Sequence, residues 1–327
     1  MSAGPGDRLS FLGDRLRRDV PVGPLTTYRV GGPARWFLEV ADGDELAAVA
    51  GALAGATPEV LVVGRGSNLL VADAGFDGLV LQLGEPFASV DMAPSPGPDG
   101  AVVVRAGGAA ALPVVARRTV EAGLTGFEWA VGVPGSVGGA VRMNAGGHGS
   151  DMAASLVTVR IVDLATGEDV EVMATDLDLS YRSSSVAPTQ VVVRADLALR
   201  PGDRAAGTDA LSEIVRWRRE HQPGGQNAGS VFTNPSDDSA GRLVDSAGCR
   251  GLRVGTAEVS TKHANFIQAD ADGSADDVFA LMVEVARRVR DHHGVLLHPE
   301  TRMVGFPPFD EAVAGSDDGM DGGGAAS

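Results

Sequence analysis

The stretch GVPGSVGGAVRMNAGGHG, residues 132–149, restricts the possible fold of this chain more than any other feature. Its small residues let the backbone approach another backbone or a ligand without side chains between them. The stretch lacks the lysine pattern of a phosphate-binding P-loop, and its glycine spacing is wrong for a dinucleotide-binding motif. Two interpretations remain open: an extended surface for a large flat ligand that carries a pyrophosphate, or close packing of strands at a domain junction.

A second glycine-rich loop, GRGSNLL at residues 64–70, directly follows an apolar run that is typical of a buried strand. Consecutive backbone N–H groups in such a loop can converge on a phosphate oxygen, and Ser67 and Asn68 can add side-chain hydrogen bonds. A tight connection without a ligand would use the same residue types. Because both loops expose mainly backbone, we expect them to hold one ligand from two sides.

The pattern between the chain ends predicts a mixed α/β protein. Apolar or alternating runs predict strands at 59–64, 79–83, 102–107, 189–199 and 295–306, with a hairpin over 158–173. Apolar residues at helical spacing predict helices at 44–54, 110–122, 208–220 and 275–292. Ser274 is the expected N-cap of the last helix, Asp277 stands at its capping-box position, and Gly294 ends it. Residues 92–100 have the composition of a loop.

Length favours two domains, because 327 residues exceed one ordinary small domain. The segment Pro201–Gly207 is the candidate boundary, since it combines proline, glycine and charge before a new helical pattern. The acidic, glycine-rich C-terminus is typical of a disordered tail. We expect four parts: an N-terminal segment 1–21, a first domain 22–202, a second domain 203–308, and a tail 309–327.

Charge and cysteine content exclude several function classes. The formal net charge of −16 disfavours nucleic-acid binding as the function, because an acidic surface repels phosphates. Cys249 is the one cysteine, so neither an intrachain disulfide nor a cysteine-based metal site can form. The sequence contains no apolar run long enough for a membrane span and no signal-peptide pattern. We expect a cytoplasmic protein; the sequence leaves the oligomeric state open and is compatible with a monomer.

Three polar residues in short motifs could carry chemistry. Arg182, in SYRSS, could clamp a carboxylate or a developing oxyanion. Ser230, in NAGSVFTNP, could donate a proton or orient a substrate, although no nucleophile elbow surrounds it. Glu300 interrupts an apolar terminal run. Each also has a structural alternative: a surface ion pair, a turn serine and a salt-bridged carboxylate, respectively.

Histidines and the single lysine offer further candidates. Lys262, His263 and Asn265 stand together in STKHANFI and could contact an anionic ligand, although a lone histidine is more often structural. The neighbouring His292 and His293 diverge at a helix end, so they do not form one metal-binding face. We therefore expect no metal site.

Eight short segments carry a resemblance to a known family. In order, they are TTYRVGGPA, GRGSNLL, GVPGSVGGAVRMNAG, LSYRSS, NAGSVFTNP, AGRLVDSAG, VSTKHANFI and GVLLHPETRMVGF. Together they resemble the UDP-N-acetylenolpyruvoylglucosamine reductases, also called UDP-N-acetylmuramate dehydrogenases, of bacterial peptidoglycan synthesis. The resemblance covers about residues 22–306.

The resemblance implies both a fold and a reaction. The fold is α+β or mixed α/β, with a two-lobed FAD-binding domain of the vanillyl-alcohol oxidase and p-cresol methylhydroxylase type. A smaller C-terminal α/β domain binds the substrate. FAD would be held non-covalently and reduced by NADPH. Hydride transfer to the enolpyruvyl group of the UDP-sugar substrate would then give UDP-N-acetylmuramate.

The same resemblance implies the site residues. The catalytic residues would be Arg182, Ser230 and Glu300. The cofactor-binding residues would be Gly64, Arg65, Gly66, Ser67, Asn68, Leu69, Gly132, Pro134, Gly135, Ser136, Gly138, Gly139, Ala140, Asn144, Ala145 and Gly146. The substrate-binding residues would be Tyr181, Asn234, Lys262, His263 and Asn265.

The chain also departs from one part of the family. The spacing between Arg182 and Ser230 resembles the shorter of two classes, which lacks a tyrosine-bearing segment that closes over the substrate. Two other functions remain alternatives. An oxidase of another alcohol or sugar would share the flavin fold, and a nucleotide-binding protein that has lost flavin would keep only the glycine loops.

Overall fold

The computed structural model describes residues 4–96 and 100–315, and the chain divides into two compact units. The first unit comprises Met1–Val20, Ala34–Ser67 and Asp77–His221. The second comprises Pro21–Pro33, Asn68–Phe76 and Gln222–Ser327. This division differs from the predicted domain limits, because helix α5 (Arg204–His221) packs on elements of the first unit and two early segments join the second.

The smaller sheet of the first unit has four strands in the order β1-β2-β5-β3. Their bounds are β1 Arg17–Pro21, β2 Pro33–Val40, β5 Phe76–Leu83 and β3 Val60–Val62. Helix α2 (Gly43–Leu53) shares an apolar core with this sheet through Leu46, Val49 and Leu53. The short helix α1 (Pro5–Arg8) precedes them. The predicted helix at 44–54 and the predicted strands at 59–64 and 79–83 are thus confirmed within a few residues.

The larger sheet of the first unit is antiparallel along the path β12-β11-β13-β7-β6, with β8 also paired to β13. Their bounds are β12 Asp169–Met173, β11 Leu156–Asp163, β13 Gln190–Pro201, β7 Val102–Gly107, β6 Val90–Pro96 and β8 Leu124–Thr125. The predicted hairpin is β11–β12. The loop predicted for 92–100 is wrong at 92–96, where the backbone pairs with β7 despite its prolines.

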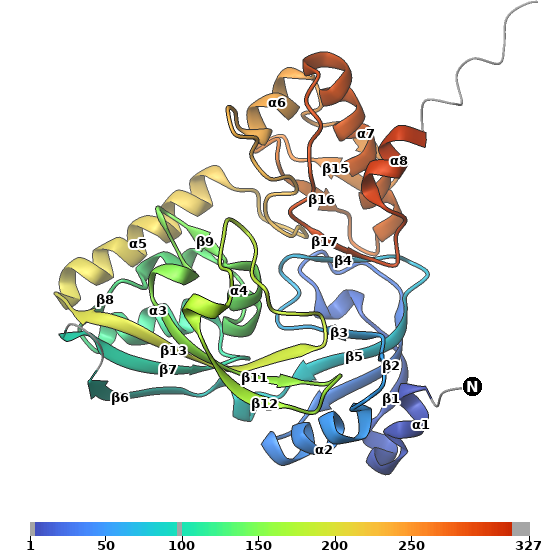
Figure 1. Cartoon of the computed structure of the whole chain (residues 1–327). Coiled ribbons are helices and arrows are strands. Elements are labelled where there is room, and N and C mark those ends of the chain that lie inside the picture. The colour runs from blue at the N-terminus through green and yellow to red at the C-terminus, as the bar shows by residue number, and fades with distance from the viewer. Residues whose placement is uncertain (1–3, 97–99, 316–327) are drawn as a thin grey trace, which may run out of the picture. The chain divides into compact units, whose positions relative to one another are not determined.

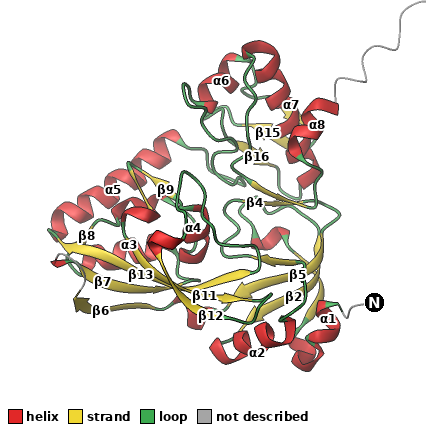
Figure 2. Ribbon diagram, in the orientation of Figure 1, coloured by secondary structure: helices red, strands yellow, loops and turns green. Residues whose placement is uncertain are grey.

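Helices α3 (Leu112–Glu121) and α4 (Val137–Met143) lie on one face of the larger sheet (Figure 2). Side chains alternate along each strand, so Val104 and Ala106 of β7 join the core with these helices while Arg105 faces away. The small pair β9 (Gly146–Gly147) and β10 (Ser150–Asp151) follows α4. The glycine-rich stretch therefore forms a helix and a hairpin, not one extended loop.

Helix α7 (Ala275–His293) forms the centre of the second unit, against the three-stranded sheet β14-β15-β16 (Figure 1). The other elements are α6 Ala240–Ser246, β14 Arg253–Val254, β15 Ala257–Val259, β16 Ile267–Ala269, β17 Arg302–Val304, α8 Phe309–Gly315 and β4 Leu69–Val71. Strand β4 pairs in parallel with β17, which joins two distant chain segments. Of the terminal strand predicted at 295–306, only 302–304 forms.

Both ends of α7 follow the sequence prediction, but the capping box does not close. Ser274 Oγ accepts from Asp277 N–H at 3.1 Å, and Gly294 ends the helix with φ 69°. The Asp277 carboxylate instead accepts from the N–H and the hydroxyl of Thr256, each at 2.8 Å. Asp73 supplies the second cap, because its carboxylate accepts from Ala275 N–H at 2.9 Å and also bonds Ser274 Oγ.

The expected disorder at 309–327 needs correction for its first part. Residues 309–315 form α8, and Phe309 and Val313 are buried in the core of the second unit because they give this acidic segment an apolar face. Residues 316–327 lie outside the described residues. Within the described part, no helix is both long and apolar enough to cross a bilayer.

Candidate active site

The two glycine-rich loops meet within the first unit. A Cβ added at Gly64 would overlap the Ser136 hydroxyl, and one added at Gly135 would lie 3.6 Å from Ser67 Oγ. Gly66 is buried and adopts φ 58°, a conformation that glycine reaches without strain. The structure therefore brings together two loops that lie about 70 residues apart, as one shared ligand requires.

The start of α4 explains several glycines by packing. Val137 N–H donates to Ala110 O at 2.9 Å, and Gly138 N–H donates to Gly108 O at 2.8 Å. A Cβ at Gly138 would lie 3.1 Å from the Val192 carbonyl oxygen. These N–H groups are bonded inside the protein, so the interpretation of close packing applies here. The backbone that remains for a ligand is that of 64–67 and 132–136.

The end of α4 also bonds within the chain. Asn144 is buried, has φ 37°, and accepts at Oδ1 from Ala153 N–H at 3.0 Å. Its Nδ2 donates to Asp151 Oδ2 at 3.2 Å and to Ser180 O at 3.0 Å. Ala145 N–H and O are engaged as well, with Ala140 and Met152. These contacts give Asn144 and Ala145 a structural role beside the cofactor contact that the sequence predicts.

Arg182 lies at the tip of a tight turn. Ser180 and Ser183 exchange both backbone hydrogen bonds, at 3.0 and 3.1 Å, and Arg182 has φ 55°. A non-glycine residue with this φ is uncommon and is found most often where surrounding contacts hold it. The guanidinium is half-buried and lies 5.2 Å from the ring centroid of the exposed Tyr181. Both residues can face a ligand from this turn.

Ser230 and Glu300 lie on neighbouring segments of the second unit. Glu300 N–H donates to Val231 O at 2.8 Å, and Thr233 N–H donates to His298 O at 2.9 Å. The two segments thus run antiparallel, and the structure brings together two residues 70 positions apart in sequence. Arg182 belongs to the other unit.

The predicted substrate-binding residues occupy the second unit, apart from Tyr181. Asn265 is buried, and its side chain bonds both the N–H and the carbonyl of Phe232, at 3.0 and 2.9 Å. His263 Nδ1 accepts from Asn265 N–H at 3.2 Å, and burial, followed by the charge of Arg250, lowers the pKa of His263. Asn234 Oδ1 accepts from Ala240 N–H at 3.0 Å at the start of α6.

Lys262 is exposed in the same segment as His263. Its backbone N–H donates to Ser260 Oγ at 3.1 Å, which fixes the start of the motif. A lysine ammonium at an exposed position can bind a phosphate as a point charge. Lys262 thus carries its positive charge on the surface, whereas the Asn265 side chain is buried and bonded to the backbone of Phe232.

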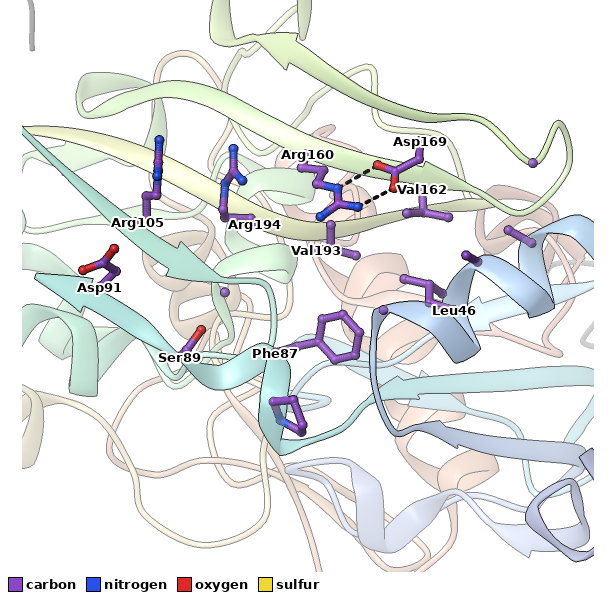
Figure 3. A pocket seen from close by; sticks show the side chains of 16 residues that line it. Leu46, Phe87, Ser89, Asp91, Arg105, Arg160, Val162, Asp169, Val193 and Arg194 are labelled. Carbon is purple, nitrogen blue, oxygen red and sulfur yellow. Dashed lines mark hydrogen bonds and ion pairs between the residues drawn. The ribbon is translucent and has the colours of Figure 1, made fainter. Parts of the chain in front are cut away.

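A separate pocket of about 350 Å³ lies on the face of the larger sheet that is turned away from α3 and α4 (Figure 3). Three arginines line it, and each pairs with a carboxylate: Arg160 with Asp169 at 2.6 Å, and Arg105 and Arg194 with Asp196 at 3.4 and 3.0 Å. No predicted site residue lines this pocket. The predicted site residues lie elsewhere in each unit, in the glycine loops and the SYRSS turn of the first and in the paired motif segments of the second.

The sequence did not single out Tyr28 as a supporting residue, although Tyr28 lies in the family motif TTYRVGGPA. Tyr28 is fully buried, and this burial raises the pKa of its hydroxyl far above the ordinary value, beside the backbone of Ala228. Ala228 precedes Ser230 by two residues, so Tyr28 supports the Ser230 segment from a distant part of the chain. The alternation of Tyr28 and Val30 around the charged Arg29 in TTYRVGG was the available signal.

The fold of the first unit and its two neighbouring glycine loops identify the class of protein. Residues 34–172 match a family described as "FAD binding domain". That segment contains both glycine loops, and the two-lobed α/β unit around them has the architecture expected of a flavin-binding oxidoreductase.

Residues 221–304 match "UDP-N-acetylenolpyruvoylglucosamine reductase, C-terminal domain". A reductase of that name from Paramagnetospirillum magneticum is 42% identical over 92% of this chain and 95% of its own. One from Acidiphilium cryptum is 43% identical, covering 90% and 92%. The crystal structure of the Thermus caldophilus reductase is 33% identical, covers 88% and 99%, and superposes with a TM-score of 0.76. The chain belongs to the UDP-N-acetylenolpyruvoylglucosamine reductase family.

The residues of the first unit fit the cofactor of this family. The contact between Gly64 and Ser136 leaves no room for a side chain, so backbone forms the surface there. Ser67 and the residues Gly132, Pro134 and Gly135 extend this surface on both sides. FAD, a long flat molecule with a pyrophosphate, matches such a surface, and the first unit would hold it between 64–67 and 132–136.

Proposed function

We propose that this protein reduces UDP-N-acetylglucosamine enolpyruvate to UDP-N-acetylmuramate for peptidoglycan synthesis, with FAD as cofactor and NADPH as reductant. The pairing of the Ser230 segment with the Glu300 segment carries the proposal, because it assembles two catalytic candidates from distant motifs. The glycine loops of the first unit add the cofactor surface. When bound, FAD supplies the hydride chemistry.

The three catalytic candidates have distinct roles in this reaction. Reduction of the enolpyruvyl double bond at its terminal carbon leaves negative charge on the substrate, delocalised toward the carboxylate. Arg182 stabilises this charge, because its guanidinium stays protonated at any working pH. Ser230 donates the proton to the carbon next to the carboxylate. Glu300 polarises the same region through hydrogen bonds.

Tyr181, Asn234, Lys262 and His263 are the proposed substrate-binding residues. Lys262 would bind the diphosphate of the UDP group, since it is a positively charged residue at an exposed position. His263 would remain neutral near pH 7 because its pKa is lowered, and it would bind substrate as a hydrogen-bonding group. We also propose that the reaction takes place in the cytoplasm.

Anaerobic mixing tests the proposed function. NADPH should bleach the flavin absorbance of the purified protein, and UDP-N-acetylglucosamine enolpyruvate should restore it. Bleaching without recovery would refute the proposed substrate. Rapid recovery with oxygen, together with turnover of another alcohol or sugar, would identify an oxidase of the same fold instead.

Ser230→Ala tests the role of the proton donor. Flavin reduction by NADPH should persist, while reoxidation by the enolpyruvyl substrate should slow by about 100-fold or more, because general acid catalysis contributes on that order. Near wild-type rates in both half-reactions would remove Ser230 from the mechanism.

A further inference from the structure

Asn68 fixes the backbone of Glu300. Its Nδ2 donates to Glu300 O at 3.0 Å, and its own carbonyl accepts from Arg302 N–H at 3.0 Å. Glu300 N–H is bonded to Val231 O. Both backbone polar groups of Glu300 are therefore held, one by the Ser230 segment and the other by the side chain of Asn68. This asparagine stands in the glycine loop that the sequence assigns to the cofactor.

Asn265 fixes the segment that follows Ser230. Its side chain bonds both backbone groups of Phe232, and its carbonyl accepts from Val231 N–H at 2.9 Å. Since Val231 O accepts from Glu300 N–H, all backbone polar groups of the two residues after Ser230 are bonded. Asn265 is buried, with 4% of its surface exposed, so these contacts occupy a side chain that solvent barely reaches.

Asn144 fixes the turn that carries Arg182. Its Nδ2 donates to Ser180 O, the carbonyl that also closes the turn, and its Oδ1 holds Ala153 N–H. A second hydrogen bond holds the same turn, because Ser184 Oγ donates to Arg142 O at 2.7 Å. The positive φ of Arg182 is thus supported by two contacts to the end of α4.

We propose that Asn68, Asn265 and Asn144 are positioning residues, which hold Glu300, Ser230 and Arg182, respectively, for the reaction. The proposal rests on the proposed function, since it takes the roles of those three residues from it. It also changes the interpretation of the motifs: these asparagines act on the backbone beside a catalytic residue, and not chiefly as contacts to cofactor or substrate.

The chemistry of the amide group explains why asparagine stands at all three positions. Its short side chain offers donors and an acceptor on one planar group, so it can bond a carbonyl and an N–H at once. It carries no net charge at any pH, so it adds no negative charge near a site that must stabilise one. Aspartate has the same shape but lacks the donor, and it would place an oxygen against the Ser180 or Glu300 carbonyl.

The test compares Asn68→Asp, Asn144→Asp and Asn265→Asp in the two flavin half-reactions. FAD content and bleaching by NADPH should stay near wild type, while reoxidation by the enolpyruvyl substrate should slow by about 10- to 100-fold, because small misplacements have effects of that size. Gln268→Glu is the matched control. It removes the amide donor that Gln268 offers to the Gly224 carbonyl at 2.8 Å. Neither residue has an assigned catalytic or binding role, so both half-reactions should stay unchanged.

Double-mutant cycles separate positioning from stability. Asn68→Asp should have little further effect in the Glu300→Ala background, and Asn144→Asp little in the Arg182→Ala background. Full additivity would overturn the proposal, as would a selective loss of FAD affinity in the asparagine variants. If Asn144→Asp does not fold, Ser184→Ala removes the second hydrogen bond to the same turn and should show the same selective slowing.

The outcomes distinguish this proposal from the proposed function. Slow reoxidation in Arg182→Ala, Ser230→Ala and Glu300→Ala, with wild-type rates in the asparagine variants, would overturn the positioning roles alone. Wild-type reoxidation in those three alanine variants would instead refute the catalytic assignment, and with it the basis of the positioning roles.

Discussion

The two units of this protein are stabilised in different ways. The larger sheet of the first unit contains the local hairpin β11–β12 and buries a broad apolar face under α3 and α4. The second unit has short strands and one long helix, and it takes in two segments from the first quarter of the chain. We therefore expect the stability of the first unit to depend on close backbone packing. The stability of the second unit should depend on hydrogen bonds and core contacts between segments that are distant in sequence.

The largest expected effect comes from removing those distant segments. A fragment of residues 222–315 lacks Tyr28, Val30 and Leu70 of the core and the Asp73 cap of α7. We expect it to show no cooperative thermal transition by near-ultraviolet circular dichroism, whereas the full chain shows one. A cooperative transition in the fragment would mean that the early segments contribute little to the second unit.

Backbone packing in the first unit can be tested at a single glycine. A Cβ at Gly108 would overlap the Val192 carbonyl oxygen, so Gly108→Ala should lower the free energy of unfolding by about 3 kcal/mol. Gly51, in α2, is the control, because a Cβ there meets nothing within 4 Å. Gly51→Ala should stabilise the protein by about 0.5–1 kcal/mol. Urea denaturation measures both; equal effects would contradict the packing argument.

A smaller difference in the free energy of unfolding is expected between variants of two helix caps. Asp73 caps α7 from a distant segment and contacts Ser274 and Ala275, so Asp73→Ala should lower the free energy of unfolding by about 2 kcal/mol. Asp42 caps α2 locally through Glu45 N–H at 2.9 Å, and Asp42→Ala should cost about 1 kcal/mol. If Asp42 proves the more important cap in urea denaturation, long-range bonds do not dominate the second unit.

The smallest expected effect is on the pH dependence of stability, and it involves one histidine in each unit. Burial, then a nearby arginine, lowers the pKa of His263 and of His148 below the ordinary 6.5. Their contribution to stability is complete above pH 6.5 and is lost as pH falls through the lowered pKa, because the unfolded chain takes up the proton first.

The shift of the urea midpoint between pH 7.5 and pH 5, two conditions on either side of the ordinary histidine pKa of about 6.5, measures this contribution. His263→Asn should reduce that shift. His148→Asn should reduce it less, since His148 is only partly shielded and is the more exposed of the two histidines. An unchanged shift in His263→Asn would show that other groups control the acid response.

The sequence predicted the strands and helices of the first unit well, because alternation and helical spacing are local signals. Strands β7, β11, β12 and β13 appear within a few residues of their expected places, as does α7 of the second unit, whereas β6 replaces part of a predicted loop. The strand predicted at 295–306 shortens to β17 because its partner is β4, and parallel pairing with a segment more than 200 residues away leaves no local pattern.

The candidate site was predictable as a set of residues but not as a set of contacts. The sequence predicted that the two glycine loops hold one ligand from two sides, and the structure brings the loops into contact at Gly64 and Gly135. For Asn68, Asn144 and Asn265 the sequence offered only an amide in a motif. Whether an amide faces a ligand or a neighbouring carbonyl depends on the tertiary structure, and in each case the structure shows backbone partners.

The cap that Asp73 provides for α7 has a consequence during synthesis on the ribosome. Asp73 and Ala275 lie 202 residues apart in the chain. At translation rates of about 5–20 residues per second, Asp73 and β4 emerge roughly 10–40 s before their partners. The first unit can begin to fold in that interval, while the apolar strand Leu69–Val71 stays unpaired because β17 has not yet been synthesised. Nascent-chain binding by chaperones should therefore concentrate on this strand until β17 has been translated.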